Sequence, residues 1–241
     1  MINLASMPSD APNHVPSDAS GHSPGESDAI RRVLPRGRNA LGREAVAASQ
    51  QARLLEAICE LTAGDGFGAI TVNELIARAG VAKPTFYEHF ESKEACLLAF
   101  VDLAMGQLED AIAGAVQPDA TTEERIVHGI TAVVEFMAAD EDRARTLLIE
   151  CFAAGRTVQR RIDAAYERLA QFYQALREES RIANPEEPPM SIVRARAIVG
   201  AIKDPLAGAL RDGHADDVLP IRDELVDGVT LLAVGHHAVT D

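Results

Sequence analysis

The sequence contains no tryptophan, and aromatic residues make up only 4% of its 241 residues. Strands are enriched in aromatic and β-branched residues, so this composition favours helices over a β-sandwich. No apolar run approaches the roughly twenty residues that a membrane-spanning helix needs. The first residues have no basic flank followed by an apolar core, so we expect no secretory signal and no membrane partner.

Cysteine is also scarce. Cys59, Cys96 and Cys151 are an odd number, widely spaced within helical patterns, which predicts buried free thiols in a reducing cytoplasm. The chain has no Gly-rich phosphate loop, no Gly-x-Ser-x-Gly elbow and no His-Glu-x-x-His helix. Adjacent positions on a helix diverge widely, so His236 and His237 do not suit one metal ion. We expect no enzyme, no cofactor, no metal site and a cytoplasmic location.

A net charge of −14 argues against nucleic acid as a partner, but the charge is unevenly distributed. Residues 1–30 contain four acids and no Lys or Arg, whereas residues 31–53 contain six arginines and one glutamate. The arginine-rich stretch is read either as a solvated linker or as an arm that contacts DNA phosphates or the minor groove. Its proximity to the motif described next favours the DNA-binding alternative.

Residues 71–93 have the plan of a helix-turn-helix. Thr71 and Glu74 have the capping-box spacing, and an amphipathic pattern follows them. Gly80 stands where a tight turn needs a residue without a Cβ. Phe86 and Phe90 are four residues apart and are predicted to be buried, which leaves the polar side chains of a second helix, about 82–89, facing outward.

The run Gly80-Val81-Ala82-Lys83-Pro84-Thr85-Phe86-Tyr87-Glu88-His89-Phe90, followed by Ser92-Lys93-Glu94-Ala95, resembles the TetR family of bacterial transcriptional regulators. The resemblance begins near Arg53 and covers about fifty residues in order and spacing. It implies contacts with a palindromic operator in double-stranded DNA. Arm and motif together nominate these DNA-binding residues: Arg36, Arg38, Arg43, Thr71, Lys83, Pro84, Thr85, Tyr87, His89 and Lys93.

Periodic apolar positions and caps predict an all-α protein of roughly nine helices. An N-terminal three-helix DNA-binding domain is followed by a larger helical ligand-binding and dimerisation domain. The boundaries are 1–44 for a disordered tail with the arginine-rich arm, 45–95 for the helix-turn-helix domain and 96–241 for the second domain. The first firm helix is expected over about 49–64, with the arm before it extended or partly helical.

The family resemblance implies an effector site between about 95 and 184, with the fourth helix transmitting the change to the DNA-binding part. Bulky or polarizable residues there either line an apolar pocket or simply fill the core. The weakly predicted pocket residues are Phe100, Met105, His128, Phe136, Met137, Phe152, Tyr166 and Tyr173.

The last two predicted helices, near 190–212 and 220–239, are apolar on more than one side. Such helices need several packing partners, which favours a homodimer with a four-helix interface over a monomeric core. The sequence therefore predicts a TetR-like repressor released from its operator by a small, largely apolar ligand. The alternative is a small-molecule-binding or protein-interaction module on the same fold without operator binding.

Overall fold

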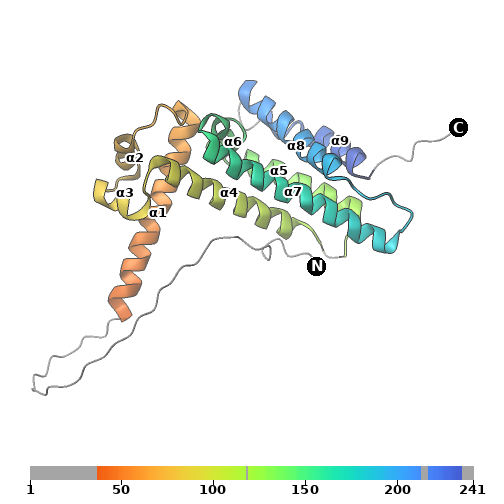
Figure 1. The fold of residues 1–241 in the computed structure, drawn as a ribbon, viewed down its shortest axis with the longest axis horizontal. Coiled ribbons are helices and arrows are strands. Elements are labelled where there is room, and N and C mark those ends of the chain that lie inside the picture. Colours follow the sequence, from red (N-terminus) through yellow and green to blue (C-terminus); the bar gives the residue numbers. More distant parts are fainter. Residues whose placement is uncertain (1–36, 118, 213–216, 235–241) are drawn as a thin grey trace, which may run out of the picture.

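The computed structural model describes residues 37–117, 119–212 and 217–234, and all regular elements in these ranges are helices (Figure 1). The all-α prediction is confirmed. The N-terminal helices are α1 (Gly37–Asp65), α2 (Val72–Ala79) and α3 (Lys83–His89). The remaining elements are α4 (Lys93–Ala115), α5 (Thr122–Ala138), α6 (Glu141–Leu148), the 3-10 turn η2 (Glu150–Ala153), α7 (Arg156–Ala183), α8 (Ile192–Asp212) and α9 (Arg222–Val234).

Helix α1 begins at Gly37, twelve residues before the predicted start at about 49. Residues 37–44 of the arm are therefore helical, one of the two forms expected for the arm, and the boundary of the tail at residue 44 stays a prediction. Residues 42–49 are largely exposed, so burial does not explain their helicity, but alanine and other good helix formers dominate this stretch. The N-terminal half of α1 projects beyond the other helices (Figure 1). Residues 1–36, including Arg36 and the tail predicted over 1–30, lie outside the described residues.

Side chains cap the starts of three later helices. Ser92 caps α4, Thr121 caps α5 and Asp140 caps α6, each by accepting a backbone N–H three residues later. The helical stretch that begins at Glu141 divides after Leu148 into α6 and η2. Residues 235–241, with His236 and His237, lie outside the described residues.

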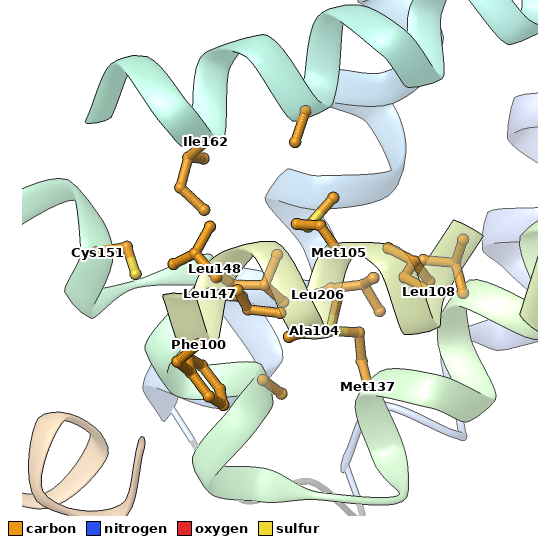
Figure 2. Packing of buried hydrophobic residues seen from close by; sticks show 14 of the residues in the cluster. Phe100, Ala104, Met105, Leu108, Met137, Leu147, Leu148, Cys151, Ile162 and Leu206 are labelled. Atoms are coloured by element: carbon orange, nitrogen blue, oxygen red, sulfur yellow. The ribbon is translucent and has the colours of Figure 1, made fainter. Parts of the chain in front are cut away.

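Helix α4 joins the two ends of the molecule, because it packs on α1 and also on α5 and α7. One cluster of buried residues extends from Leu54 of α1 to Ala233 of α9. Figure 2 shows part of this core, with Met105 and Leu108 of α4 near Leu206 of α8 and Met137 of α5. The N-terminal helices thus share a continuous core with the larger part, and the domain boundaries stay a prediction.

Candidate DNA-binding face and effector cavity

The helix-turn-helix is held by three separate devices, one at the start of α2 and two at the turn between α2 and α3. Thr71 and Glu74 form the predicted capping box, with the Thr71 N–H donating to the Glu74 carboxylate at 2.8 Å and the Glu74 N–H donating to Oγ1 of Thr71 at 3.2 Å. Gly80 adopts a left-handed conformation with φ of 61°, which favours glycine. Arg53 of α1 donates from one nitrogen to the carbonyls of Ala79 and Gly80, at 3.0 and 3.2 Å.

Lys93 braces the loop that precedes α2. Its ammonium donates to the carbonyls of Phe67 and Ile70, at 2.9 and 2.6 Å, and lies 4.5 Å from the centroid of the Phe67 ring. The phosphate contact predicted for Lys93 stays a prediction, with two carbonyls already bound by its ammonium. Arg53, counted with the basic arm in the sequence, and Lys93 both hold the motif together.

The second helix of the motif presents a polar surface over a buried aromatic base. Phe86 is fully buried and Phe90 nearly so, with ring centroids 6.1 Å apart, as predicted. Tyr87 is half exposed, and its ring packs edge-to-face against the Phe86 ring with the centroids 5.2 Å apart. This contact orients the Tyr87 ring while part of the side chain stays accessible to a partner. Lys83 and Pro84 are exposed, and Thr85 and His89 are half-buried.

The other residues predicted to bind DNA lie on different elements. Thr71 is exposed, but its hydroxyl already donates to Glu74 at 2.8 Å. Arg43 is exposed on the projecting part of α1, and Arg38 lies in the first turn of that helix. Lys83, Thr85, Tyr87 and His89 thus lie together on one short helix. Arg38 and Arg43 lie along α1 instead.

An apolar cavity of about 40 Å³ lies between α4, α5, α6, α7 and α8. A cavity of this size holds about one water molecule. Its lining is almost entirely hydrocarbon and aromatic rings. The lining residues are Leu108, Ile112, Val133, Met137, Leu148, Tyr166, Leu169, Phe172, Tyr173, Val199, Ile202, Lys203 and Leu206.

Three of the eight predicted pocket residues line this cavity, namely Met137, Tyr166 and Tyr173. The other five do not. Phe100 lines a groove between α1, α4 and α6, and Met105 is buried in the core. His128 and Phe136 are half-buried on α5, and the Phe136 ring stacks under the Arg143 guanidinium at 3.9 Å. Phe152 lies beside the cavity, with the ammonium of Lys203 5.4 Å from its ring centroid.

Sequence reasoning missed the α8 wall, because the effector site was expected between about 95 and 184, before this helix begins. Val199, Ile202 and Leu206 follow i, i+3, i+7 spacing, and Lys203 falls on the same stripe. A charged residue within an apolar stripe was the signal that could have identified this wall.

A family model described as bacterial regulatory proteins, tetR family, matches residues 54–100, which run from α1 through the turn to the start of α4. Over these residues the chain is similar to the TetR family. A relative named HTH-type transcriptional activator FasR, from Mycolicibacterium smegmatis, is 26% identical over 55% of this chain. The fatty acid metabolism regulator protein of Bacillus subtilis is 24% identical over 46% of it. The matches span 61% and 57% of these relatives' own lengths.

A solved structure with the same fold is that of the transcriptional regulator FadR from Bacillus subtilis in complex with stearoyl-CoA. Its TM-score is 0.67 at 20% identity, covering 77% of this chain and 99% of that one. FadR from Bacillus halodurans gives a TM-score of 0.67 at 19% identity, covering 78% and 96%. The fold of this chain beyond residue 100 is therefore also shared with solved structures.

Helices α8 and α9 form an open apolar groove of about 430 Å³. Ala201, Ala209 and Gly228 are small residues in its walls, and Leu232 lines it with 44% of its surface exposed. Pro205 lies inside α8 and contributes no N–H to the helix. None of the described helices is long and apolar enough to span a membrane. Within the described ranges, no three acidic, His or Cys side chains are grouped as metal ligands would be.

Proposed function

We propose that the protein is a homodimeric transcriptional repressor that binds a palindromic operator and is released by a small, largely apolar ligand. The observation that carries this proposal is the helix-turn-helix itself. The capping box fixes the start of its first helix, and Gly80 and Arg53 fix its turn. Its second helix offers exposed Lys83 and Tyr87 beside half-buried Thr85 and His89. Such donors suit phosphates and base edges. We propose no catalytic role and a cytoplasmic location.

The ligand that we propose is a long-chain acyl compound. The cavity offers apolar walls over five elements and two tyrosines, which suit a flexible hydrocarbon chain. FadR of Bacillus subtilis, which has the same fold, was solved with stearoyl-CoA, and another relative is named a fatty acid metabolism regulator. These names concern those proteins and support an acyl ligand here as part of the proposal.

Ligand entry requires the helices to move apart, since a cavity of about 40 Å³ is far smaller than a typical ligand site of ~300–1,000 Å³. Two of the helices that line the cavity, α4 and α6, also make contacts with the DNA-binding part. Leu108 and Ile112 belong to α4, whose first turn carries the Lys93 brace. Leu148 belongs to α6, and the hydroxyl of Thr146 on α6 donates to the Cys59 carbonyl of α1 at 3.1 Å. A ligand that favours the opened form by ~1–3 kcal/mol would change operator affinity by about 5–150-fold.

Dimerisation through α8 and α9 completes the proposal. The apolar groove between these helices is flanked by exposed Leu231 and Leu232, which a self-complementary partner face would cover. Two copies of α3 related by a two-fold axis would then read the two halves of a palindromic site.

The test is a fluorescence-anisotropy titration of the protein on the DNA upstream of its own gene, at two salt concentrations and with scrambled competitor DNA. Specific binding by one dimer per site is expected, and addition of stearoyl-CoA should weaken it. Lys83→Ala should lower affinity across sequences and reduce the salt slope by about one.

Arg160→Ala is the matched control, because Arg160 is an exposed cation on α7. It should leave both affinity and salt slope unchanged. Wild-type binding no tighter than to scrambled DNA, across a genome-wide selection of fragments, would refute the operator-binding proposal and favour the module without DNA binding. Operator binding that stearoyl-CoA strengthens would refute the repressor assignment.

A further inference from the structure

Lys203 is a charged residue in an otherwise apolar helix face. Val199, Ile202, Lys203 and Leu206 of α8 follow i, i+3, i+4, i+7 spacing, and all four line the cavity. The three apolar members are at most 8% exposed. Of the thirteen described residues that line the cavity, Lys203 alone carries a charge. Placing an ammonium at such a position costs free energy unless something compensates it.

The compensation that the structure provides is weak. The Lys203 ammonium pairs with the Asp204 carboxylate at 2.9 Å, but that aspartate side chain is 75% exposed, and exposed ion pairs stabilise little. On the cavity side, the ammonium lies 5.4 Å from the Phe152 ring centroid and 6.0 Å from that of Tyr166. Lys203 is itself 28% exposed, so its side chain connects the cavity wall with solvent.

Tyr166 of α7 adds a second donor at this wall. The residue lines the cavity, and the Lys203 ammonium lies 6.0 Å from its ring centroid. Burial raises the pKa of Tyr166, so its phenol stays neutral and able to donate. Lys203 and Tyr166 therefore bring two hydrogen-bond donors to the lining of one apolar cavity.

We propose that Lys203 anchors the head of the effector. The ligand is an apolar chain that ends in a carboxylate or thioester carbonyl, and this terminal oxygen accepts hydrogen bonds from Lys203 and Tyr166. The chain then occupies the space opened between α4, α5, α7 and α8. This assignment rests on the proposed function, since it names the polar end of the same ligand.

The physical reason is the difference between a bonded and an unbonded charge in a dry site. A charge-assisted hydrogen bond is stronger than a neutral one, and low local polarity strengthens it further. A chain without a terminal acceptor would bury the ammonium without replacing its hydration. Lys203 therefore selects the oxygen-terminated chain over an equally long alkyl chain with a weaker acceptor.

The experiment measures direct binding of laurate, lauroyl-CoA and dodecanol to the full chain by isothermal titration calorimetry, without DNA. Lys203→Met keeps an unbranched side chain and removes the charge. It should weaken laurate or lauroyl-CoA, whichever the wild type binds more tightly, by about 10- to 150-fold and leave dodecanol within a few-fold. The tighter of those two probes identifies the free acid or the thioester as the source.

Arg196→Met is the matched control on the same helix, because Arg196 is an exposed cation paired with Glu167 of α7. It should leave all three affinities unchanged. Lys203→Arg keeps the charge and should retain most of the affinity, which preserves the test if Lys203→Met does not fold.

Four outcomes would overturn the anchor. If Lys203→Met binds each probe as tightly as the wild type does, the Lys203 charge does not contribute to ligand binding. If Lys203→Met loses the same affinity for all three probes, Lys203 acts through packing and not through its charge. If Lys203→Met does not fold, a loss of the preferred acyl probe in folded Lys203→Arg would count against it. If the folded wild type binds none of the probes, the proposed ligand class is wrong and the anchor falls with it.

Discussion

Two buried threonines differ in what their hydroxyl groups do. Thr146 of α6 is fully buried, and its hydroxyl donates to the Cys59 carbonyl of α1 at 3.1 Å. Thr62 of α1 is equally buried, but its hydroxyl has no hydrogen-bond partner among the described residues. One hydroxyl thus joins the effector part to the DNA-binding part, whereas the other was desolvated without compensation.

Replacing each threonine by valine should therefore have opposite effects on stability. Thr146→Val should lower the free energy of unfolding by about 0.5–1.5 kcal/mol, the usual net value of a hydrogen bond. Thr62→Val should be neutral or stabilising by ~1 kcal/mol, since no bond is lost with the buried hydroxyl. Urea unfolding with unchanged m-values measures both differences. A Thr146→Val protein as stable as the wild type would contradict this reading of the α1–α6 contact.

The two capping boxes predict a specific acid dependence. Hydrogen bonds from the Thr71 backbone and hydroxyl lower the pKa of Glu74 below its ordinary 4.5, and Thr121 does the same for the pKa of Glu124. A lowered folded-state pKa gives stability that is present above the unfolded pKa and is lost as the pH falls through the folded pKa.

Glu74→Gln and Glu124→Gln keep a hydrogen-bond acceptor at the same helix position but cannot titrate. Each variant should lose less thermal stability than the wild type when the pH is lowered from neutral to below 4.5. Thermal unfolding midpoints measured across this range test the prediction. Identical pH profiles for wild type and both variants would show that the caps do not contribute to the acid dependence.

At the scale of elements, the sequence predicted best where a helix has both a cap and a buried face. Helices α2 and α4 have Thr71 and Ser92 as caps and apolar residues at regular spacing. The first turns of α1 have neither signal, since residues 42–46 are exposed and only helix propensity favours them. A pattern of burial could not predict a segment that buries little.

The cavity was harder to predict for a related reason. A residue that lines a small cavity and a residue that fills the core have the same periodicity, so Met105 and Met137 look alike in the sequence although only Met137 lines the cavity. The braces at Arg53 and Lys93 depend on contacts with residues 23 to 27 positions away, which local patterns do not contain.

The projecting half of α1 supports a prediction about the helix as a unit. Proline at position 48 would remove a backbone hydrogen bond and clash with the preceding turn, uncoupling residues 37–47 from the rest of α1. Ala48→Pro should reduce both DNA affinity and the steepness of its salt dependence, since it displaces Arg38 and Arg43. The midpoint of thermal unfolding should change little, because residues 42–49 are mostly exposed and bury little of the core.

Ala48→Ser is the control, since serine at an exposed helix position costs far less than proline. Anisotropy titrations at two salt concentrations, with thermal unfolding alongside, separate the two effects. Unchanged affinity and salt slope in folded Ala48→Pro would show that the projecting half of α1 does not contact DNA.

At the scale of the whole molecule, the charge distribution favours one orientation toward DNA. The chain carries −14 overall, yet residues 31–53 hold six arginines and one glutamate. The part of this stretch that the structure describes is in α1, which packs against α2 and α3. The acidic remainder would be repelled by phosphates, so a DNA duplex is expected to approach the α1–α3 end.

Operator binding by a single recognition helix of seven residues offers few base contacts, so specificity depends on the dimer. Leu232 lines the α8–α9 groove and is 44% exposed, and an aspartate there would place a charge in the proposed interface. Leu232→Asp should sediment as a monomer at concentrations where the wild type is a dimer. Its preference for operator over scrambled DNA, typically ~10³–10⁷-fold for specific DNA-binding proteins, should fall steeply.

Ile182→Asp is the matched control, because Ile182 is 80% exposed at the end of α7, away from the groove. It should remain dimeric and retain operator preference, which separates loss of the interface from a general effect of added negative charge. A Leu232→Asp protein that stays dimeric would exclude this groove as the interface. A monomeric Leu232→Asp protein with full operator preference would instead show that one helix-turn-helix is sufficient for specific binding. That result would contradict the proposed palindromic operator.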